Sequence, residues 1–95
     1  MITHVVMFKL LDRSPENIRR TRDVLTAMEG KIPQLKSLEV GIDVLRSERS
    51  YDIVLIAKFD SLEDLKLYND HPVHQEVLRY IATVKDVSIA VDYES

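Results

Sequence analysis

Histidines and tyrosines are the side chains of this 95-residue sequence best suited to proton transfer near neutral pH. His4 lies in an apolar segment, whereas Tyr68, His71 and His74 occur together in the segment YNDHPVH. A helical pattern starts at Pro72, so His74 falls close to a helix start, where the helix dipole disfavours a charged imidazole and lowers its pKa. A neutral imidazole can serve as a general base, and His74 is therefore the first catalytic candidate.

Each histidine is also weighed against a purely structural role. His4 fits a half-buried residue that is satisfied by one hydrogen bond. His71 precedes Pro72 and fits a cap or turn residue, because a residue before proline is excluded from the helical region. Nothing structural calls for histidine at position 74. The proline break between His71 and His74 argues against a shared metal site, and we predict no metal and no cofactor.

Composition excludes several other classes of protein. The chain has no cysteine and only two glycines, which excludes disulfides, thiolate sites and glycine-rich phosphate loops. A net charge of −3 argues against nucleic-acid partners and anionic membranes. The longest uninterrupted apolar run, Ile53 to Ala57, is far shorter than the roughly 20 residues that span a bilayer. We therefore expect a cytoplasmic protein.

Alternating hydrophobic patterns predict four strands that must position these residues. In the first strand, His4, Val6 and Phe8 share one face because strand side chains alternate. The second is expected to place Leu38, Val40, Ile42 and Val44 on one face. The first and third strands carry apolar residues on both faces. The predicted strands cover residues 2–11, 34–45, 51–59 and 87–93.

Helix signals fall between these strands. Ser14 and Pro15 are typical of an N-cap followed by the first helical residue, and Gly30 marks the end of that helix. Ser61 caps a second helix, with Asp64 as its capping-box partner. That helix is expected to break at His71–Pro72 and to resume from the proline.

The order β-α-β-β-α-β predicts an α+β, ferredoxin-like protomer that occupies residues 1–95 as one domain. Its four-stranded antiparallel sheet would carry both helices on one face. The opposite face would remain apolar, and an uncovered apolar face marks an interface. We therefore predict a homodimer closed sheet to sheet, burying about 800 Å² per partner.

Several segments resemble the Dabb, or stress-responsive α/β-barrel, domain family. They are HVVMFK from His4, IPQLKSLEVGID, YDIVLIAKFDSLEDLKLYNDHPVH and the Asp92–Tyr93 pair. They span nearly the whole chain in the right order. The resemblance implies a ferredoxin-like protomer that dimerises through its sheet into an α/β barrel, in agreement with the pattern above.

The resemblance also implies functional residues. A plant polyketide cyclase of this family is similar at His74, Tyr68 and His4, which would act as general base, hydrogen-bond partner and anchor for the ligand. Val6 and Phe8 on the first strand, Leu25 on the first helix and His71 are the expected ligand-binding residues. The cyclase pocket is rich in aromatic residues, whereas this chain has only two phenylalanines and no tryptophan. A smaller or more polar ligand, or no ligand, therefore fits better.

Three functions follow from these observations. The first is a homodimer with a pocket for a small hydrophobic molecule and no assigned activity. The second is a cofactor-independent enzyme, either a cyclase or lyase that abstracts a proton through histidine or a related monooxygenase. The third is a stress-protective assembly protein whose chamber is filled by side chains. An open cavity that touches His4, Tyr68 and His74 would favour the first two.

Overall fold

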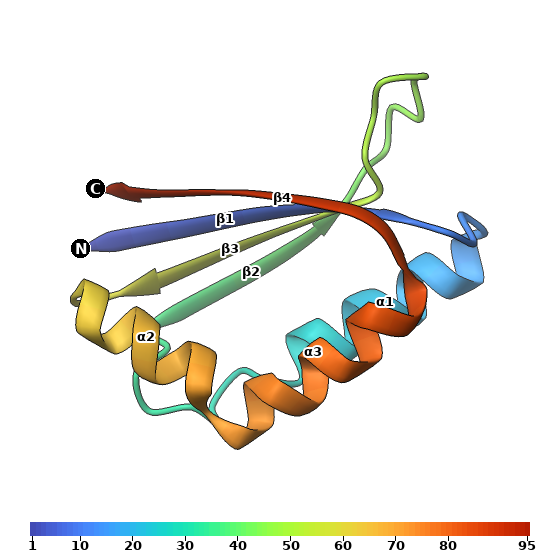
Figure 1. Cartoon of the computed structure of the whole chain (residues 1–95). Coiled ribbons are helices and arrows are strands. Elements are labelled where there is room, and N and C mark those ends of the chain that lie inside the picture. Colours follow the sequence, from blue (N-terminus) through green and yellow to red (C-terminus); the bar gives the residue numbers. More distant parts are fainter.

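One sheet and one layer of helices make up the fold. The computed structural model describes residues 1–95, with both termini at the same end of the sheet (Figure 1). The hydroxyl of Thr3 donates to Ser95 Oγ at 2.7 Å, which joins these ends. The elements are β1 (Ile2–Leu10), α1 (Pro15–Thr26), β2 (Ser37–Ile42), β3 (Ile53–Phe59), α2 (Leu62–Asp70), α3 (Pro72–Val84) and β4 (Lys85–Glu94).

The sheet has the strand order β2-β3-β1-β4, with every neighbouring pair antiparallel. This confirms the predicted ferredoxin-like α+β fold. The predicted second helix consists of α2 and α3, which meet at His71, as the proline break indicates. In the register of β1, His4 lies opposite Ala57 of β3 and Asp92 of β4. Residues on three strands therefore share one face at this level.

The helices cover one face of the sheet and bury its side chains (Figure 1). Alternation along β3 is strict, with Ile53, Leu55, Ala57 and Phe59 buried and the residues between them only partly buried. Helix residues spaced three or four apart meet this face, as amphipathic helices require. The buried helix residues of the hydrophobic core are Ile18, Leu25, Leu65, Tyr68 and Ile81.

Serine caps start the first two helices, as predicted. The Asn17 N–H donates to Ser14 Oγ at 3.3 Å, and the Asp64 N–H donates to Ser61 Oγ at 3.1 Å. Only this half of the expected capping box forms at Ser61. Helix α1 ends at Thr26, earlier than predicted, and a turn leads to Gly30, whose φ of +80° favours glycine.

The prediction for the end of the second strand is wrong. Strand β2 stops at Ile42, and Val44 is 93% exposed in a loop instead of facing the core. The chain turns because the Asp43 carboxylate accepts a hydrogen bond of 2.7 Å from the Arg46 N–H. This side-chain bond replaces the strand pairing that the alternating hydrophobic pattern alone predicts.

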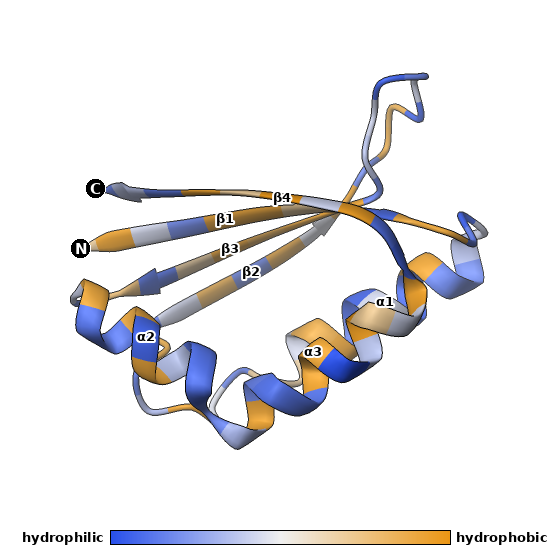
Figure 2. Cartoon of the chain, viewed as in Figure 1, coloured by the Kyte–Doolittle hydropathy of each residue, from blue (hydrophilic) through white to orange (hydrophobic).

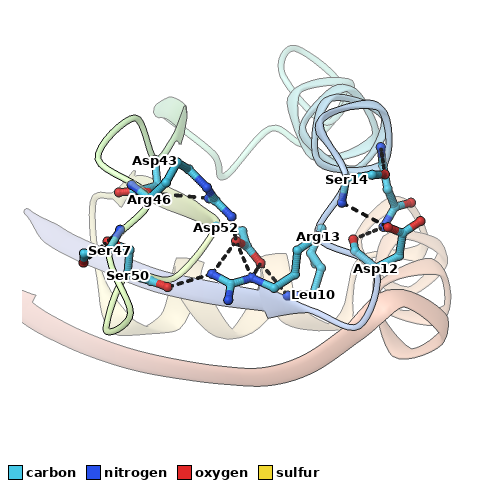
Figure 3. A network of polar contacts seen from close by, with 10 residues as sticks. Leu10, Asp12, Arg13, Ser14, Asp43, Arg46, Ser47, Ser50 and Asp52 are labelled. Atoms are coloured by element: carbon cyan, nitrogen blue, oxygen red, sulfur yellow. Dashed lines mark hydrogen bonds and ion pairs between the residues drawn. The ribbon is translucent and has the colours of Figure 1, made fainter.

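A buried carboxylate holds the base of this loop (Figure 3). Asp52 is fully buried and accepts hydrogen bonds from the Leu10 N–H at 2.8 Å, Arg13 Nε at 3.0 Å and Arg46 Nη2 at 2.8 Å. Burial raises the pKa of Asp52, but the hydrogen bonds from Leu10, Arg46 and Arg13 outweigh this and hold it below its ordinary value. The carboxylate therefore ties the end of β1 to the β2–β3 connection.

The opposite face of the sheet is apolar and has no helix over it. We call it the open face. It extends over β3, β1 and β4, and Figure 2 shows hydrophobic residues along these strands. None of the helices is long and apolar enough to cross a membrane. The apolar side chains and Tyr93 that the register assigns to the open face are Val5, Met7, Val54, Ile56, Val87, Ile89, Val91 and Tyr93, and Thr3, Lys9 and Lys58 lie on the same face.

Candidate functional site

A cavity of about 330 Å³ lies between the sheet and the helices. This is at the lower end of the range for small-molecule sites. Nine of its 16 lining residues are hydrophobic, and the predicted ligand-binding residues Val6, Phe8 and Leu25 all line it. The full lining is His4, Val6, Phe8, Leu25, Met28, Leu55, Tyr68, Asn69, Asp70, His74, Gln75, Val77, Leu78, Ile81, Lys85 and Ser88.

His74 lines this cavity from the first turn of α3 and is only 8% exposed. Its Nδ1 lies 3.1 Å from the backbone carbonyl oxygen of Asn69. Because a carbonyl only accepts, this contact places a proton on Nδ1 of the neutral ring. Nε2 then keeps its lone pair, which is the state a general base requires.

The surroundings of His74 favour this neutral form. Burial lowers the pKa of His74 below its ordinary value. The hydrogen bond to Asn69 opposes this change, whereas repulsion from His4 and His71 adds to it. The pKa thus moves in the direction that the helix start predicts, although burial is the main cause.

Tyr68 lies between the two histidines that line the cavity. Its ring centroid is 4.3 Å from that of His74 and 6.3 Å from that of His4. Its hydroxyl donates to Met28 Sδ at 3.9 Å and to neither imidazole. Burial raises the pKa of Tyr68 well above its ordinary value, so the phenol stays protonated. Tyr68 therefore contacts the histidines through its ring.

His4 enters the same cavity from β1 and pairs with a carboxylate of β4. Its Nδ1 contacts Asp92 Oδ1, and the two residues are opposite each other in the β1–β4 register. Because a carboxylate only accepts, the Nδ1 proton of His4 points to Asp92. His4 thus has a fixed ring orientation, which an anchor for a ligand requires.

His71, also expected to bind ligand, does not line the cavity. It joins α2 to α3, and its Nδ1 accepts a hydrogen bond of 3.1 Å from the Val73 N–H. Its backbone is extended because Pro72 follows. The three histidines therefore do not converge, and no group of three or more potential ligands is placed to hold a metal ion.

Sequence patterns missed three partners of the candidate site. Asp92 orients His4, the Asn69 carbonyl sets the proton position of His74, and Met28 accepts from Tyr68. The parity of the last strand, in which Ser88, Ala90 and Asp92 share a face, is a signal for Asp92. A backbone carbonyl has no sequence signal at all. The resulting site is a cavity with both apolar and polar walls, and in it Nε2 of His74 accepts no hydrogen bond and has a lowered basicity.

The chain is similar to a known protein family and to a bacterial relative. The family model described as "Stress responsive A/B Barrel Domain" matches residues 2–95. An uncharacterised protein of Streptomyces coelicolor is 31% identical over 78 residues, which cover 79% of this chain and 80% of that protein.

Two solved structures are similar over almost the whole chain. A dimeric ferredoxin-like protein of unknown function from Bacteroides fragilis is 31% identical, with a TM-score of 0.85 over 99% of this chain and 95% of the other. A dimeric ferredoxin-like protein of unknown function from Thermobifida fusca is 27% identical, with a TM-score of 0.87 over 99% and 90%.

Proposed function

The chain belongs to the stress responsive A/B barrel domain family, and we propose that it is a homodimer in which each copy binds a small, largely apolar molecule. The molecule would lie in the cavity between the sheet and the helices. The observation that carries this proposal is the cavity itself, because side chains leave about 330 Å³ open beside two oriented imidazoles. A protein that acts only as an assembly unit has no need of such a chamber.

The chemistry of the lining supports a compact, mostly apolar ligand. Val6, Phe8, Leu25 and Leu55 supply apolar walls from the sheet and α1. His4 and His74 add polar groups in fixed orientations, which give a ligand direction as well as affinity. A molecule with one polar group and a short apolar body matches this distribution.

The open face supports the dimer. Its apolar side chains come from three neighbouring strands, and Met7, Ile89 and Val91 are exposed there. Such a patch on a monomer marks an interaction site. The relatives from Bacteroides fragilis and Thermobifida fusca are both described as dimeric. A second copy packed sheet to sheet would remove this surface from water.

Native mass spectrometry of the protein purified from its own cells tests this function. We expect the mass of a dimer together with a small molecule retained by each copy. Ser88→Phe should lose the small molecule, because position 88 lines the cavity, whereas Lys66→Phe on the exposed side of α2 should retain it. If Ser88→Phe fails to fold, Val77→Phe is a second variant that fills the cavity, because Val77 also lines it. A dimer without added mass, or with a ligand that both filled variants retain, contradicts the proposal.

The hydrogen bond between His74 and Asn69 favours a second candidate, a cofactor-independent enzyme that abstracts a proton beside a carbonyl. Nε2 of His74 would accept that proton, and the apolar walls would exclude water from the resulting enolate. Positioned general bases contribute about 100-fold to 10,000-fold in rate.

Hydrogen exchange of acetophenone in deuterated water tests this second function. NMR should show faster loss of the methyl proton signal with the protein than with buffer. His74→Gln should lower that rate about 100-fold, because glutamine cannot act as a base. Exchange that is unchanged in His74→Gln rules out His74 as the base, and a variant destabilised by several kcal/mol would identify His74 as a core residue instead.

A further inference from the structure

Residues 43–52 form a projection that we call the arm. In Figure 1 it rises from the sheet on the side away from the helices. One limb of the arm carries two apolar side chains, Val44 and Leu45, which are 93% and 76% exposed. The polar turn at residues 47–50 forms the tip. Figure 2 shows a hydrophobic stretch on one limb below a hydrophilic tip. Exposed loops are ordinarily polar, and neighbouring exposed apolar side chains are typical of a contact surface.

The arm has a fixed conformation. Arg46 has a φ of 56°, in the left-handed region that arginine rarely adopts. Its N–H donates to Asp43 Oδ2 at 2.7 Å, and its guanidinium donates to Asp52 at 2.8 Å. Ser47 and Ser50 are joined by their hydroxyls at 2.7 Å. These contacts hold an unfavourable backbone angle next to Val44 and Leu45, which orders this part of the arm before any partner is met.

The arm is continuous with the open face. A hollow of about 210 Å³ lies at its foot. Met7 and Val54 of the open face contribute to this hollow, as do Gly41 of β2 and Tyr51 of the arm. A surface that covers the open face would therefore also reach the foot of the arm, and the arm projects on that same side.

We propose that the arm packs Val44 and Leu45 against a second copy of this chain and extends the interface beyond the two sheets. This inference rests on the proposed homodimer. Two-fold symmetry doubles the contact, because each copy sends one arm to the other. The fixed base lowers the entropy cost of association, because the arm is ordered before binding.

Photo-cross-linking tests the contact directly. The chain has no native cysteine, so Leu45→Cys takes a single benzophenone label. Protein with natural isotopes is unfolded and refolded together with nitrogen-15 protein, which gives mixed dimers. After irradiation, mass spectrometry should find light–heavy cross-linked chains. Leu62→Cys is the matched control, since Leu62 is 65% exposed on the helix layer and should give none.

Dimer affinity gives a second readout. Val44→Ser with Leu45→Ser should weaken the dimer about 100-fold, because four apolar side chains per dimer are affected. Leu62→Ser should leave its dissociation constant unchanged. A dimer that shows no light–heavy pairs, or whose double variant changes less than about twofold, overturns the arm contact alone. A wild-type chain that sediments as a monomer overturns the homodimer as well.

Discussion

At the scale of single residues, the chemistry of the candidate site depends on how His74 is held. Its ring is buried against Tyr68, and the Asn69 carbonyl fixes the proton on Nδ1. These contacts leave Nε2 as the basic atom without any charged partner. His4 differs, because Asp92 provides a carboxylate for its ring. The site thus combines one imidazole in apolar surroundings with one beside a negative charge.

The lowered pKa of His74 predicts how stability depends on pH. The folded state binds fewer protons than the unfolded chain, so stability rises with pH where the unfolded histidine still titrates. We expect the free energy of unfolding to fall as the pH is lowered through 6.5, the ordinary pKa of histidine, toward the lower folded pKa. Urea unfolding at several pH values measures this.

His74→Gln is the control for that measurement, because glutamine can still donate to the Asn69 carbonyl but does not titrate. The variant should lose this part of the pH dependence. A wild-type curve and a His74→Gln curve that run parallel between pH 5 and 7 would show that protonation of His74 does not oppose folding.

The sequence predicts the residues of the candidate site better than it predicts their partners. His4, Tyr68 and His74 have side chains with known proton chemistry, and local patterns place each near the start or end of an element. The pairing of His4 with Asp92 depends on the register of two strands that lie 88 positions apart in the chain. Local sequence does not encode such a register, because shifting one strand by two residues preserves the same hydrophobic face.

At the scale of elements, strand and helix positions follow from periodicity, whereas their ends depend on individual polar contacts. The second predicted strand continues to residue 45 on hydrophobicity alone, but Asp43 turns the chain after Ile42. The break between α2 and α3 was predictable because Pro72 restricts the residue before it. The local sequence shows a backbone restriction such as that imposed by proline. It does not show which group will donate a hydrogen bond to a given carboxylate.

Asp52 predicts a large change in stability. Asp52→Asn removes the negative charge that faces Arg13 and Arg46 and should lower the free energy of unfolding by about 3 kcal/mol. Because the pKa of Asp52 is held low, its ionised form stabilises the fold above its unfolded pKa of 3.8, and this contribution is lost as the pH falls further. Urea titration at pH 7 measures the difference at a fixed protein concentration.

Asp86→Asn is the matched control, because Asp86 is exposed at the start of β4. That change should alter the free energy of unfolding by less than about 0.5 kcal/mol. An Asp52→Asn variant as stable as Asp86→Asn would mean that the buried carboxylate does not hold the loop base.

At the scale of the whole molecule, the predicted oligomeric state depends on where apolar surface is exposed. Three helices cover one face of a four-stranded sheet and enclose the cavity, which leaves the open face without cover. A chain of 95 residues has a small core, so the proposed second copy would add stability as well as an interface. The sequence predicted this face because apolar residues occupy both sides of the first and third strands. It did not place Val44 and Leu45 in the arm, since both were expected in the second strand.

Sedimentation equilibrium tests the open face most directly. The wild-type chain should behave as a dimer at micromolar concentration. Val91→Asp, at a position 61% exposed on the open face, should give a monomer that remains folded by circular dichroism, because it places a charge in the apolar interface. Leu62→Asp, on the helix layer, should remain a dimer. A wild-type chain that sediments as a monomer at these concentrations, or a Val91→Asp chain that remains a dimer, would contradict the account.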